Sequence, residues 1–516
     1  MPQSKPNFLL IMADQFTAKA LRALGNKTVI TPNLDRLIEK GVLFENCYCN
    51  LPMCAPSRAS LHTGKLPFDI GMYDNANEFP SDLPTFAHYL RNLGYRVELT
   101  GKMHFVGPDQ YHGYEKRHTT EIYPANFAWT VDWSKGRTYR PTNLTMAPII
   151  ESGPCIRSLQ MDYDDEVAYT GCQALYDLAR KYDERPFFLT VSFTSPHSPF
   201  VIGQKYWDLY DHEAIELPEV PPMELANMDY LSRNLHYCQA RDQYTVTDEH
   251  RRMARHGYYG MISYIDDKVG QLLSILEETG LDDSTITIFT SDHGEMMGER
   301  GMWFKQHFFD WAAKVPLIFH FPKDFGPAKV GTNVSLIDLL PTFMDLASGK
   351  EFEDYSMEID GSSLVGSLGG TSEGLDDTVI SEFAADGSTG PSRMVKMGSW
   401  KYMWLEGVDE LLYNLDDDPN EVRNLSADPD YAAQKQSLKH VLLDGWDPGS
   451  LRRVISESQR RRLSIHKATG GFPTNVNIAR VDDEHRYVRN AGAADTKAKA
   501  RLPYVTPVKP DTKAKG

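Results

Sequence analysis

Two pairs of polar residues follow apolar runs at points where their side chains could bind a metal ion. Asp14-Gln15 comes after the run 7–12, and Asp292-His293 comes after the run 285–290. Two carboxylates, an amide oxygen and an imidazole together suit one divalent cation such as Ca²⁺ or Mg²⁺. Aspartate and glycine are also common where a strand turns into a loop, so Asp292-His293-Gly294 taken alone fits a plain turn better.

A cysteine is the centre of a second cluster. The sequence Cys54-Ala55-Pro56-Ser57-Arg58 is followed by Leu61, Thr63 and Gly64. A lone cysteine at the start of a helix is most often a partly buried, inert side chain. Histidines and lysines elsewhere could move protons or bind an anion, although a single lysine is usually a surface charge. These residues are Lys102, His104, His197 and Lys305.

Short, nearly continuous apolar runs recur along the chain, and polar residues follow each of them. The runs cover residues 7–12, 95–99, 187–193 and 285–290. This pattern is typical of strands that are buried on both faces of a sheet. Helical periodicity lies between the runs, over residues 31–37, 83–93 and 258–280. The alternation predicts an α/β fold with a mainly parallel mixed sheet flanked by helices.

The positions of the polar residues in this fold predict where a ligand binds. Ligands of open α/β sheets bind beyond the carboxyl ends of the strands. We therefore expect the polar residues that follow the strands to meet near one crevice. These residues are Asp14, Lys102, His197, Asp292 and His293.

The last third of the chain has a different pattern. A glycine-rich stretch at 361–374 predicts a hinge, with a larger α/β domain over residues 1–375 and a smaller domain over 376–516. Short runs predict an antiparallel sheet and a helix at 431–443 follows them. The runs cover residues 378–383, 394–397, 401–405 and 411–415. The tail from Ala491 is rich in alanine, lysine and proline, which predicts either disorder or docking on a neighbouring subunit.

The composition argues against several classes of partner. The chain has 54 basic and 71 acidic residues, a net charge of −17. Nucleic acids and anionic membranes both require a basic surface, so neither is expected. No apolar run approaches the roughly 20 residues of a membrane span, and no secretory cleavage site follows Met1, so we expect a cytoplasmic protein. Six cysteines in a chain this long do not indicate a disulfide scaffold, and the spacing of Cys47, Cys49 and Cys54 is poor for zinc.

The pattern C-x-P-S-R-x-x-L-x-T-G that begins at Cys54 resembles the signature of the formylglycine-dependent (type I) sulfatases. This resemblance implies an alkaline-phosphatase-like core and a maturation enzyme that oxidises Cys54 to formylglycine. It also implies one divalent metal ion, Ca²⁺ first and Mg²⁺ or Mn²⁺ as alternatives. The metal ligands would be Asp14, Gln15, residue 54, Asp292 and His293.

The resemblance also assigns roles to the basic residues. Gly101-Lys102-Met103-His104 is similar to the G-K-x-H element of the family, in which the lysine binds sulfate and the histidine acts as a base on the aldehyde hydrate. His197 matches the P-H-x-P element and would protonate the leaving oxygen. Lys305 would be a second sulfate ligand, and Arg58 would position the formylglycine. One hydroxyl of the hydrate would attack sulfur, and the other would later expel sulfate.

Residues 5 to 345 most resemble the choline sulfatases, a subgroup that cleaves a small quaternary-ammonium ester. The most specific matches are 73–80, 101–110, 122–130 and 159–167. A quaternary ammonium cannot donate a hydrogen bond, so its pocket needs an aromatic face and an acid. Trp129 would be the face, with Asn75 nearby, and Asp386 would be the acid where the subgroup has a longer glutamate. Trp129 is equally well interpreted as a core aromatic.

Four features of the sequence leave other substrates open. Asp386, a changed segment at 472–477 and the extra aromatics Trp303, Trp311 and Trp404 allow sulfated saccharides or aryl sulfates. Asp14-Gln15 replaces the two acids of many sulfatases and is similar to phosphonate and phosphodiester hydrolases. A vestigial site that only binds a ligand is a further alternative. In the choline subgroup the tail reaches a neighbouring subunit, which implies a dimer or tetramer.

Overall fold

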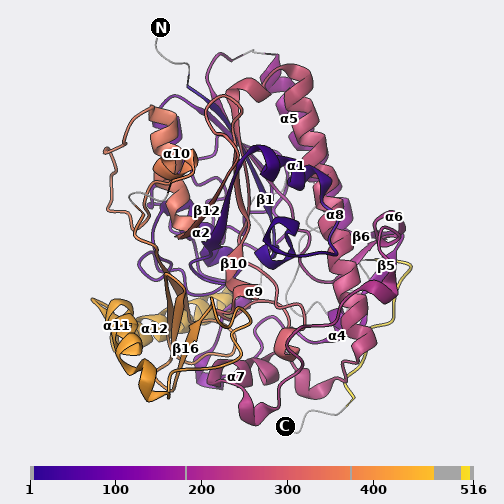
Figure 1. Ribbon diagram of the computed structural model, residues 1–516, viewed down its shortest axis with the longest axis vertical. Coiled ribbons are helices and arrows are strands. Elements are labelled where there is room, and N and C mark those ends of the chain that lie inside the picture. Colours follow the sequence, from indigo (N-terminus) through magenta and orange to yellow (C-terminus); the bar gives the residue numbers. More distant parts are fainter. Residues whose placement is uncertain (1–4, 181–182, 372–374, 470–500, 512–516) are drawn as a thin grey trace.

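A large mixed sheet forms the centre of the molecule. The computed structural model describes residues 5–180, 183–371, 375–469 and 501–511. Within these residues, nine strands form the sheet in the order β10-β2-β11-β9-β1-β7-β3-β4, with β12 beside β2 (Figure 1). Its strands are β1 (Asn7–Ala13), β2 (Val42–Tyr48), β3 (Arg96–Gly101), β4 (Lys116–Arg117), β7 (Phe187–Ser192), β9 (Thr285–Ser291), β10 (Lys314–Val315), β11 (Leu317–His320) and β12 (Ala328–Ser335).

The pairing of the strands confirms the predicted mainly parallel sheet. β1 runs parallel to both β7 and β9, and β3 runs parallel to β7. β11 runs antiparallel to β9 and β2, which makes the sheet mixed. The carboxyl ends of β9, β1, β7 and β3 therefore lie side by side at one edge of the sheet.

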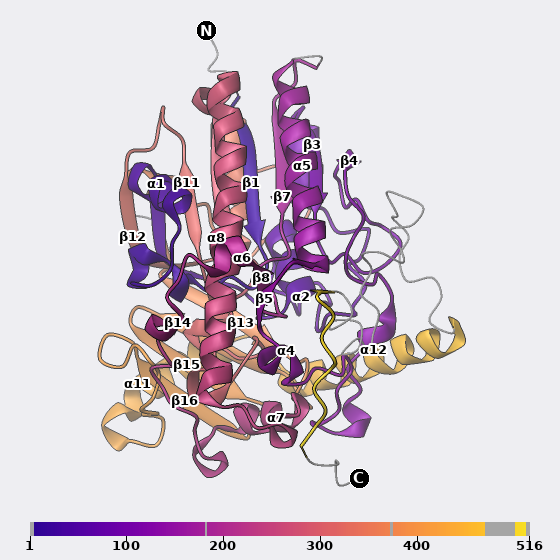
Figure 2. The same cartoon turned by 90° about the vertical axis from the view of Figure 1, so that its right-hand side faces the viewer.

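Helices cover both faces of the sheet. Successive side chains of β1 point to opposite faces. Phe8 and Leu10 belong to one buried apolar cluster, and Leu9 and Ile11 belong to the other. Helices α2, α3 and α10 add to the first cluster, while α1, α5 and α8 add to the second (Figures 1 and 2). The α-helices of this part are α1 (Pro32–Lys40), α2 (Cys54–Thr63), α3 (Phe86–Asn92), α4 (Ala147–Ile150), α5 (Leu159–Ala179), α6 (Gln204–Trp207), α7 (Tyr230–Cys238), α8 (Asp248–Thr279), α9 (Asp310–Ala313) and α10 (Leu339–Ser348).

Helix α8 begins ten residues before the predicted start at Tyr258. Thr247 caps it, accepting a hydrogen bond from the backbone N–H of His250 at 3.2 Å. Asp248 and Glu249 lie in the first turn, where negative charge is favoured. The prediction was short because this first part of the helix is recognisable by its cap and charges rather than by an apolar stripe.

A second, antiparallel sheet lies in the C-terminal part, as predicted. It consists of β13 (Thr378–Phe383), β14 (Ser392–Met397), β15 (Trp400–Leu405) and β16 (Asp409–Asn414). Phe383 and Met394 pack into the same buried cluster as Phe8, so the two sheets share apolar contacts. Tyr402 packs against α11 (Ala432–Leu443) on the other side. Where one domain ends and the next begins, near 375, stays a prediction.

Helix α12 (Pro448–Thr469) follows and was not predicted. The described part of the tail contains β17 (Arg501–Leu502), which pairs with β6 (Arg157–Ser158) of the same chain. β5 (Gly153–Cys155) and β8 (Val201–Gly203) form another small pair. The segment 472–477 lies outside the described residues. Among the described helices, none has both the length and the apolar character that a bilayer span requires.

Candidate active site

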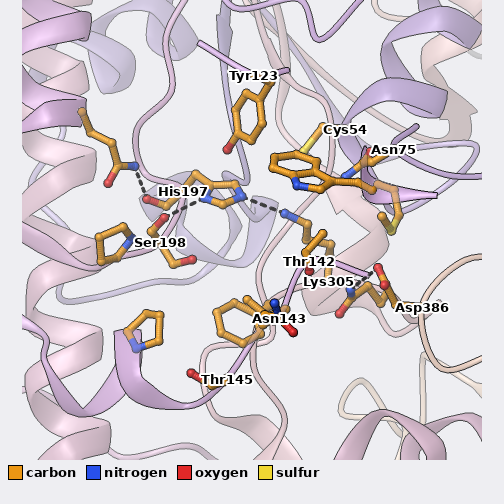
Figure 3. Close-up of a pocket in the computed structure, with 18 of the residues that line it drawn as sticks. Cys54, Asn75, Tyr123, Thr142, Asn143, Thr145, His197, Ser198, Lys305 and Asp386 are labelled. Carbon is orange, nitrogen blue, oxygen red and sulfur yellow. Dashed lines mark hydrogen bonds between the residues drawn. The ribbon is translucent and has the colours of Figure 1, made fainter. Parts of the chain in front are cut away.

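Cys54 is the first residue of α2 and is almost fully buried, with 1% of its surface exposed. Its Sγ lies 3.2 Å from Nε2 of His293 and 3.7 Å from Oδ1 of Asp14. The thiol therefore lies at the amino end of a helix, where the helix dipole favours a negative charge. If Cys54 is oxidised to formylglycine, as the resemblance of its motif implies, an oxygen of the aldehyde or of its hydrate takes the place of Sγ. Cys54 lies at one end of the pocket that Figure 3 shows.

Four residues at this position form a candidate metal centre. The ligand atoms of Asp14, Cys54, Asp292 and His293 all lie within 4.8 Å of one another, and all four side chains are buried. Burial and the neighbouring charge of Asp292 raise the pKa of Asp14 to about 6. Two buried carboxylates this close are electrostatically unfavourable without a cation. The donor set of carboxylate oxygens and one imidazole thus fits a divalent metal ion.

Gln15 lies beside this centre and is held by two hydrogen bonds. Its Oε1 accepts from Nζ of Lys305 at 2.6 Å, and its Nε2 donates to Oε2 of Glu295 at 2.5 Å. The backbone of Gln15 is in the left-handed region, with φ of 69°, which is uncommon for a residue with a side chain. Gln15 therefore presents a neutral oxygen to the site and connects it to Lys305.

Arg58 joins the ends of three strands from its position one turn along α2. Its Nε donates to Oδ2 of Asp292 at 2.7 Å. One terminal nitrogen donates to the carbonyl of Lys102 at 2.7 Å and to Oγ of Ser192 at 2.8 Å. These acceptors belong to the ends of β9, β3 and β7, so Arg58 fixes the start of α2, and with it Cys54, against the sheet.

Two lysines surround the thiol. The ammonium of Lys102 pairs with Asp14 and lies 4.2 Å from the centre of the Tyr123 ring. Lys305 reaches Gln15 and Nε2 of His197. Burial opposes ionisation of Cys54, yet the charges of Lys102 and Lys305 hold the pKa of its thiol well below the usual range. The site is therefore built to stabilise negative charge on an oxygen or sulfur at this position.

His104 is a buried neutral imidazole. Its ring stacks on Tyr123 with 4.5 Å between centroids. Burial and the nearby charge of Lys102 lower its pKa to about 3. Within the described part of the chain, neither ring nitrogen has a hydrogen-bond partner. Glu121 positions this turn, because its Oε2 accepts from the backbone N–H groups of Met103 and His104 at 2.8 Å each. An uncharged ring with a free acceptor nitrogen can take up a proton.

His197 has its two nitrogens in different environments. Nδ1 lies 2.8 Å from the carbonyl oxygen of Ser198, and Nε2 lies 2.9 Å from the ammonium of Lys305. A carbonyl only accepts and an ammonium only donates, so these bonds assign the proton to Nδ1. Figure 3 shows Lys305 between His197 and Asp386.

The pocket has a volume of about 110 Å³, and Cys54 is one of the residues that line it. Asn75, Trp129 and Asp386 all contribute to its lining. Asn75 Oδ1 accepts from the backbone N–H of Ala55 at 3.0 Å, next to the nucleophile position. Asp386 accepts from Nε2 of Gln306 at 2.9 Å, and burial raises its pKa to about 6. Among the described residues that line the pocket, none is Trp303, Trp311 or Trp404, so these three tryptophans do not support a saccharide pocket.

Sequence reasoning missed three residues that the structure brings into the site. Tyr123 stacks on His104, and the face of its ring contacts the Lys102 ammonium. Glu121 and Glu295 accept hydrogen bonds from the backbone and side chains of site residues. The sequence could have indicated Glu295, because this acid lies two residues after His293 at the end of the same strand. Glu121 and Tyr123 carried no signal for the site, since their contacts with Lys102 and His104 join segments that are separate in the sequence.

Comparisons with known proteins agree with this geometry. The family model described as "Sulfatase" matches residues 6–350, and a model described as "N-sulphoglucosamine sulphohydrolase, C-terminal" matches residues 298–445. A choline-sulfatase of Rhizobium meliloti is 39% identical over 96% of this chain and 98% of its own length. An arylsulfatase of Clostridium perfringens is 28% identical over 85% of this chain and 94% of its own.

Solved structures share the fold. A phosphonate monoester hydrolase of Agrobacterium radiobacter has a TM-score of 0.68 at 27% identity, covering 87% of this chain and 96% of the other. A 2-O GAG sulfatase has a TM-score of 0.65 at 22% identity, covering 95% of this chain and 100% of the other. The strand-end metal centre, the buried cysteine at a helix start and the family match together define the class. The chain belongs to the sulfatase family, and it is a sulfuric ester hydrolase with the alkaline-phosphatase-like fold.

Proposed function

We propose that this sulfatase hydrolyses choline O-sulfate to choline and inorganic sulfate. The main support is the choline-sulfatase of Rhizobium meliloti, which aligns with nearly the whole chain at 39% identity. The pocket supports the same substrate, because its lining offers aromatic and apolar groups and one buried acid, among polar side chains and the cations Lys305 and Arg501. Tyr123 and Trp129 supply aromatic surface, and Asp386 supplies the acid. A quaternary ammonium is attracted by such faces and by a carboxylate, without needing a hydrogen-bond acceptor.

The catalytic assignments follow from the positions of the side chains. Formylglycine at position 54 would supply a nucleophile with two hydroxyls in its hydrated form. Lys102 and Lys305 flank this position and would bind the sulfate oxygens, neutralising the charge that moves through the reaction. Neutral His104 would accept a proton from the second hydroxyl. His197 would deliver a proton from Nε2 to the leaving alcohol, once its contact with Lys305 has been exchanged for one with substrate.

We assign the resident metal as Ca²⁺, with Mg²⁺ and Mn²⁺ as alternatives. Asp14, Gln15, Asp292, His293 and residue 54 would hold it. Carboxylate and amide oxygens dominate this set, which favours a hard cation. When bound, the metal would polarise the sulfate oxygens and acidify the hydrate. Arg58 would keep Asp292 oriented toward it through the 2.7 Å bond.

The same proposal includes the partners and location expected from the sequence. A formylglycine-generating enzyme would have to act on Cys54 before the chain folds, because the thiol is buried in the folded protein. All six cysteines are free, which agrees with a reducing cytoplasm. A dimer or tetramer that uses the C-terminal tail completes the proposal, and sedimentation of the purified enzyme tests it.

Steady-state kinetics test the substrate. The full chain, produced together with a maturation enzyme, is assayed with choline O-sulfate and with 4-nitrophenyl sulfate, following sulfate release. The proposal requires a higher kcat/KM for choline O-sulfate even though nitrophenolate is the better leaving group. Turnover of choline O-sulfate no faster than that of the aryl ester would reject choline as the substrate and leave an aryl or saccharide sulfatase.

A second candidate is a phosphonate or phosphodiester hydrolase. Gln15 favours it, because its neutral amide replaces a carboxylate and makes the centre less negative. The likeness to the Agrobacterium radiobacter phosphonate monoester hydrolase favours it too. Rates on a phenyl phosphonate monoester and on a sulfate ester with the same leaving group decide between them. A rate on the phosphonate equal to that on the sulfate would support this second function.

A further inference from the structure

Arg462, on the helix α12 that no sequence pattern predicted, makes a buried bidentate ion pair with Asp74. Its two terminal nitrogens lie 2.7 and 2.9 Å from the two carboxylate oxygens of Asp74. Arg462 is 5% exposed and Asp74 is 1% exposed. Such a fork-to-fork pair fixes direction as well as distance, which a lysine cannot do.

The same guanidinium reaches a second loop. One terminal nitrogen lies 3.3 Å from Oγ1 of Thr130, and Nε lies 3.3 Å from Oγ of Ser458 on the same helix. One turn earlier on α12, Oε1 of Gln459 accepts from the backbone N–H of Trp133 at 3.1 Å. Helix α12, whose far end projects from the body of the protein in Figure 2, therefore holds the loop at 130–133 through two residues.

Both loops carry a residue of the pocket wall directly beside the contact. Asp74 precedes Asn75, and Thr130 follows Trp129; Asn75 and Trp129 line the pocket. Among the described residues that line this pocket, neither Arg462 nor Asp74 is found. The ion pair therefore does not contact a substrate in this pocket. It does connect the two loops that carry the pocket residues Asn75 and Trp129.

We propose that Arg462 is a positioning residue for substrate selection, which fixes the distance between Asn75 and Trp129 and so the width of the alcohol half of the pocket. This rests on the proposed function only in taking the Asn75 and Trp129 wall as the binding site of the alcohol. The sulfate half is held separately, by Lys102 and Lys305 at the strand ends. Arg462 should therefore act on binding of the alcohol and leave binding of sulfate unchanged.

Product inhibition separates the two halves. R462K keeps the charge but loses the fork. T130V keeps the ion pair but removes the contact of Arg462 to the second loop, together with the 2.8 Å hydrogen bond from Thr130 Oγ1 to the Phe127 carbonyl. The matched control is R461M, since Arg461 lies on the same helix with 67% of its side chain exposed. For each full-length matured variant we would measure KM, kcat and the inhibition constants of choline and of inorganic sulfate, together with the melting temperature.

R462K should raise KM and the choline inhibition constant about tenfold to a hundredfold, because small displacements of a binding wall have effects of that size. T130V should raise both about two- to fivefold, less than R462K, because the 3.3 Å contact that it removes is longer than the bonds of Arg462 to Asp74. The sulfate inhibition constant and kcat should stay within about threefold, well below a tenfold step of 1.4 kcal/mol, and R461M should match the wild type throughout.

Variants with a lower melting temperature but unchanged inhibition constants for choline and sulfate would show that the Arg462–Asp74 pair only holds α12 in place. The proposal would then be wrong. Equal losses of choline and sulfate binding would also overturn it. If R462K does not fold, T130V decides by the same criterion. If the wild type does not cleave choline O-sulfate, the proposed function fails, and the role of Arg462 is tested with the ester that it does cleave and that ester's alcohol.

Discussion

The ammonium of Lys305 donates a 2.9 Å hydrogen bond to Nε2 of His197, while Nδ1 of the same ring donates to a carbonyl. Nε2 therefore carries no proton in the resting site. The Lys305 ammonium lies against the nitrogen that would have to carry a proton in order to protonate a leaving alcohol. A sulfate group that attracts Lys305 would free Nε2 for protonation. In the proposed mechanism, binding of sulfate by Lys305 and protonation of His197 would be coupled through this one contact.

This contact predicts that the loss of rate caused by the H197A substitution depends on the leaving group of the ester. Loss of a general acid typically costs about 100- to 10,000-fold in rate, and an alkoxide leaving group needs the proton most. We expect kcat for choline O-sulfate to fall in that range, while kcat for 4-nitrophenyl sulfate falls much less. Stopped assays for sulfate measure both rates, and K205A is the control, because the Lys205 side chain is 72% exposed. Equal losses on both esters would assign His197 another role.

Asp386 predicts a pH effect that depends on the charge of the substrate. Burial raises its pKa to about 6, so the carboxylate is neutral below that pH and charged above it. A cationic alcohol is attracted only by the charged form. The kcat/KM for choline O-sulfate should therefore fall as pH drops through about 6, more steeply than that for an uncharged alkyl sulfate.

The variant D386N provides the control for this pH effect, because the amide has a similar shape and does not titrate in this range. The two esters should then show the same pH profile below pH 7. A difference that persists in D386N would mean that another group senses the cation.

Arg58 predicts a large stability effect at the catalytic centre. Its guanidinium and the Asp292 carboxylate are both fully buried. Removing one partner of such a pair leaves an uncompensated buried charge, which typically costs about 3–5 kcal/mol. R58A should lower the free energy of unfolding by that amount in urea titrations. R58K should lose less stability but still lose activity, since lysine cannot reach Asp292, Ser192 and the Lys102 carbonyl together. A loss in R58A below about 1 kcal/mol would contradict a tightly coupled pair.

Metal removal should affect stability as well as rate. Without a metal ion, the buried carboxylates of Asp14 and Asp292 lie within 4.8 Å of each other, and burial and the charge of Asp292 raise the pKa of Asp14 despite the nearby Lys102 and Arg58. A ligand at a thousand times its Kd stabilises the folded state by about 4 kcal/mol. Chelation should therefore lower the melting temperature and abolish sulfate release, and adding back Ca²⁺, Mg²⁺ or Mn²⁺ should identify the metal that restores both. In D14N/D292N, chelation should no longer shift the melting temperature. An unchanged melting temperature on chelating the wild type would reject the metal centre.

The sequence predicted those parts of the site that leave a local pattern. Asp14 and Asp292 follow apolar strands, and the rule for open sheets brought them together, since β1 and β9 are neighbours. Cys54 was found through its motif. Glu121, Tyr123 and the Arg462–Asp74 pair were not, because each depends on contacts between segments that no periodicity connects. Helix α12 was missed because its buried face carries Ser458, Gln459 and Arg462 beside Ile455, so no apolar stripe marks it.

Mass spectrometry of the Cys54 peptide, combined with activity, tests the central claim most directly. Protein made with a maturation enzyme should give a peptide lighter than the unmodified one, as expected when the thiol becomes an aldehyde. Across preparations with different degrees of conversion, sulfate release from choline O-sulfate should rise in proportion to the converted fraction, and C54A should release none. Full activity in a preparation whose Cys54 is entirely unmodified would contradict the account.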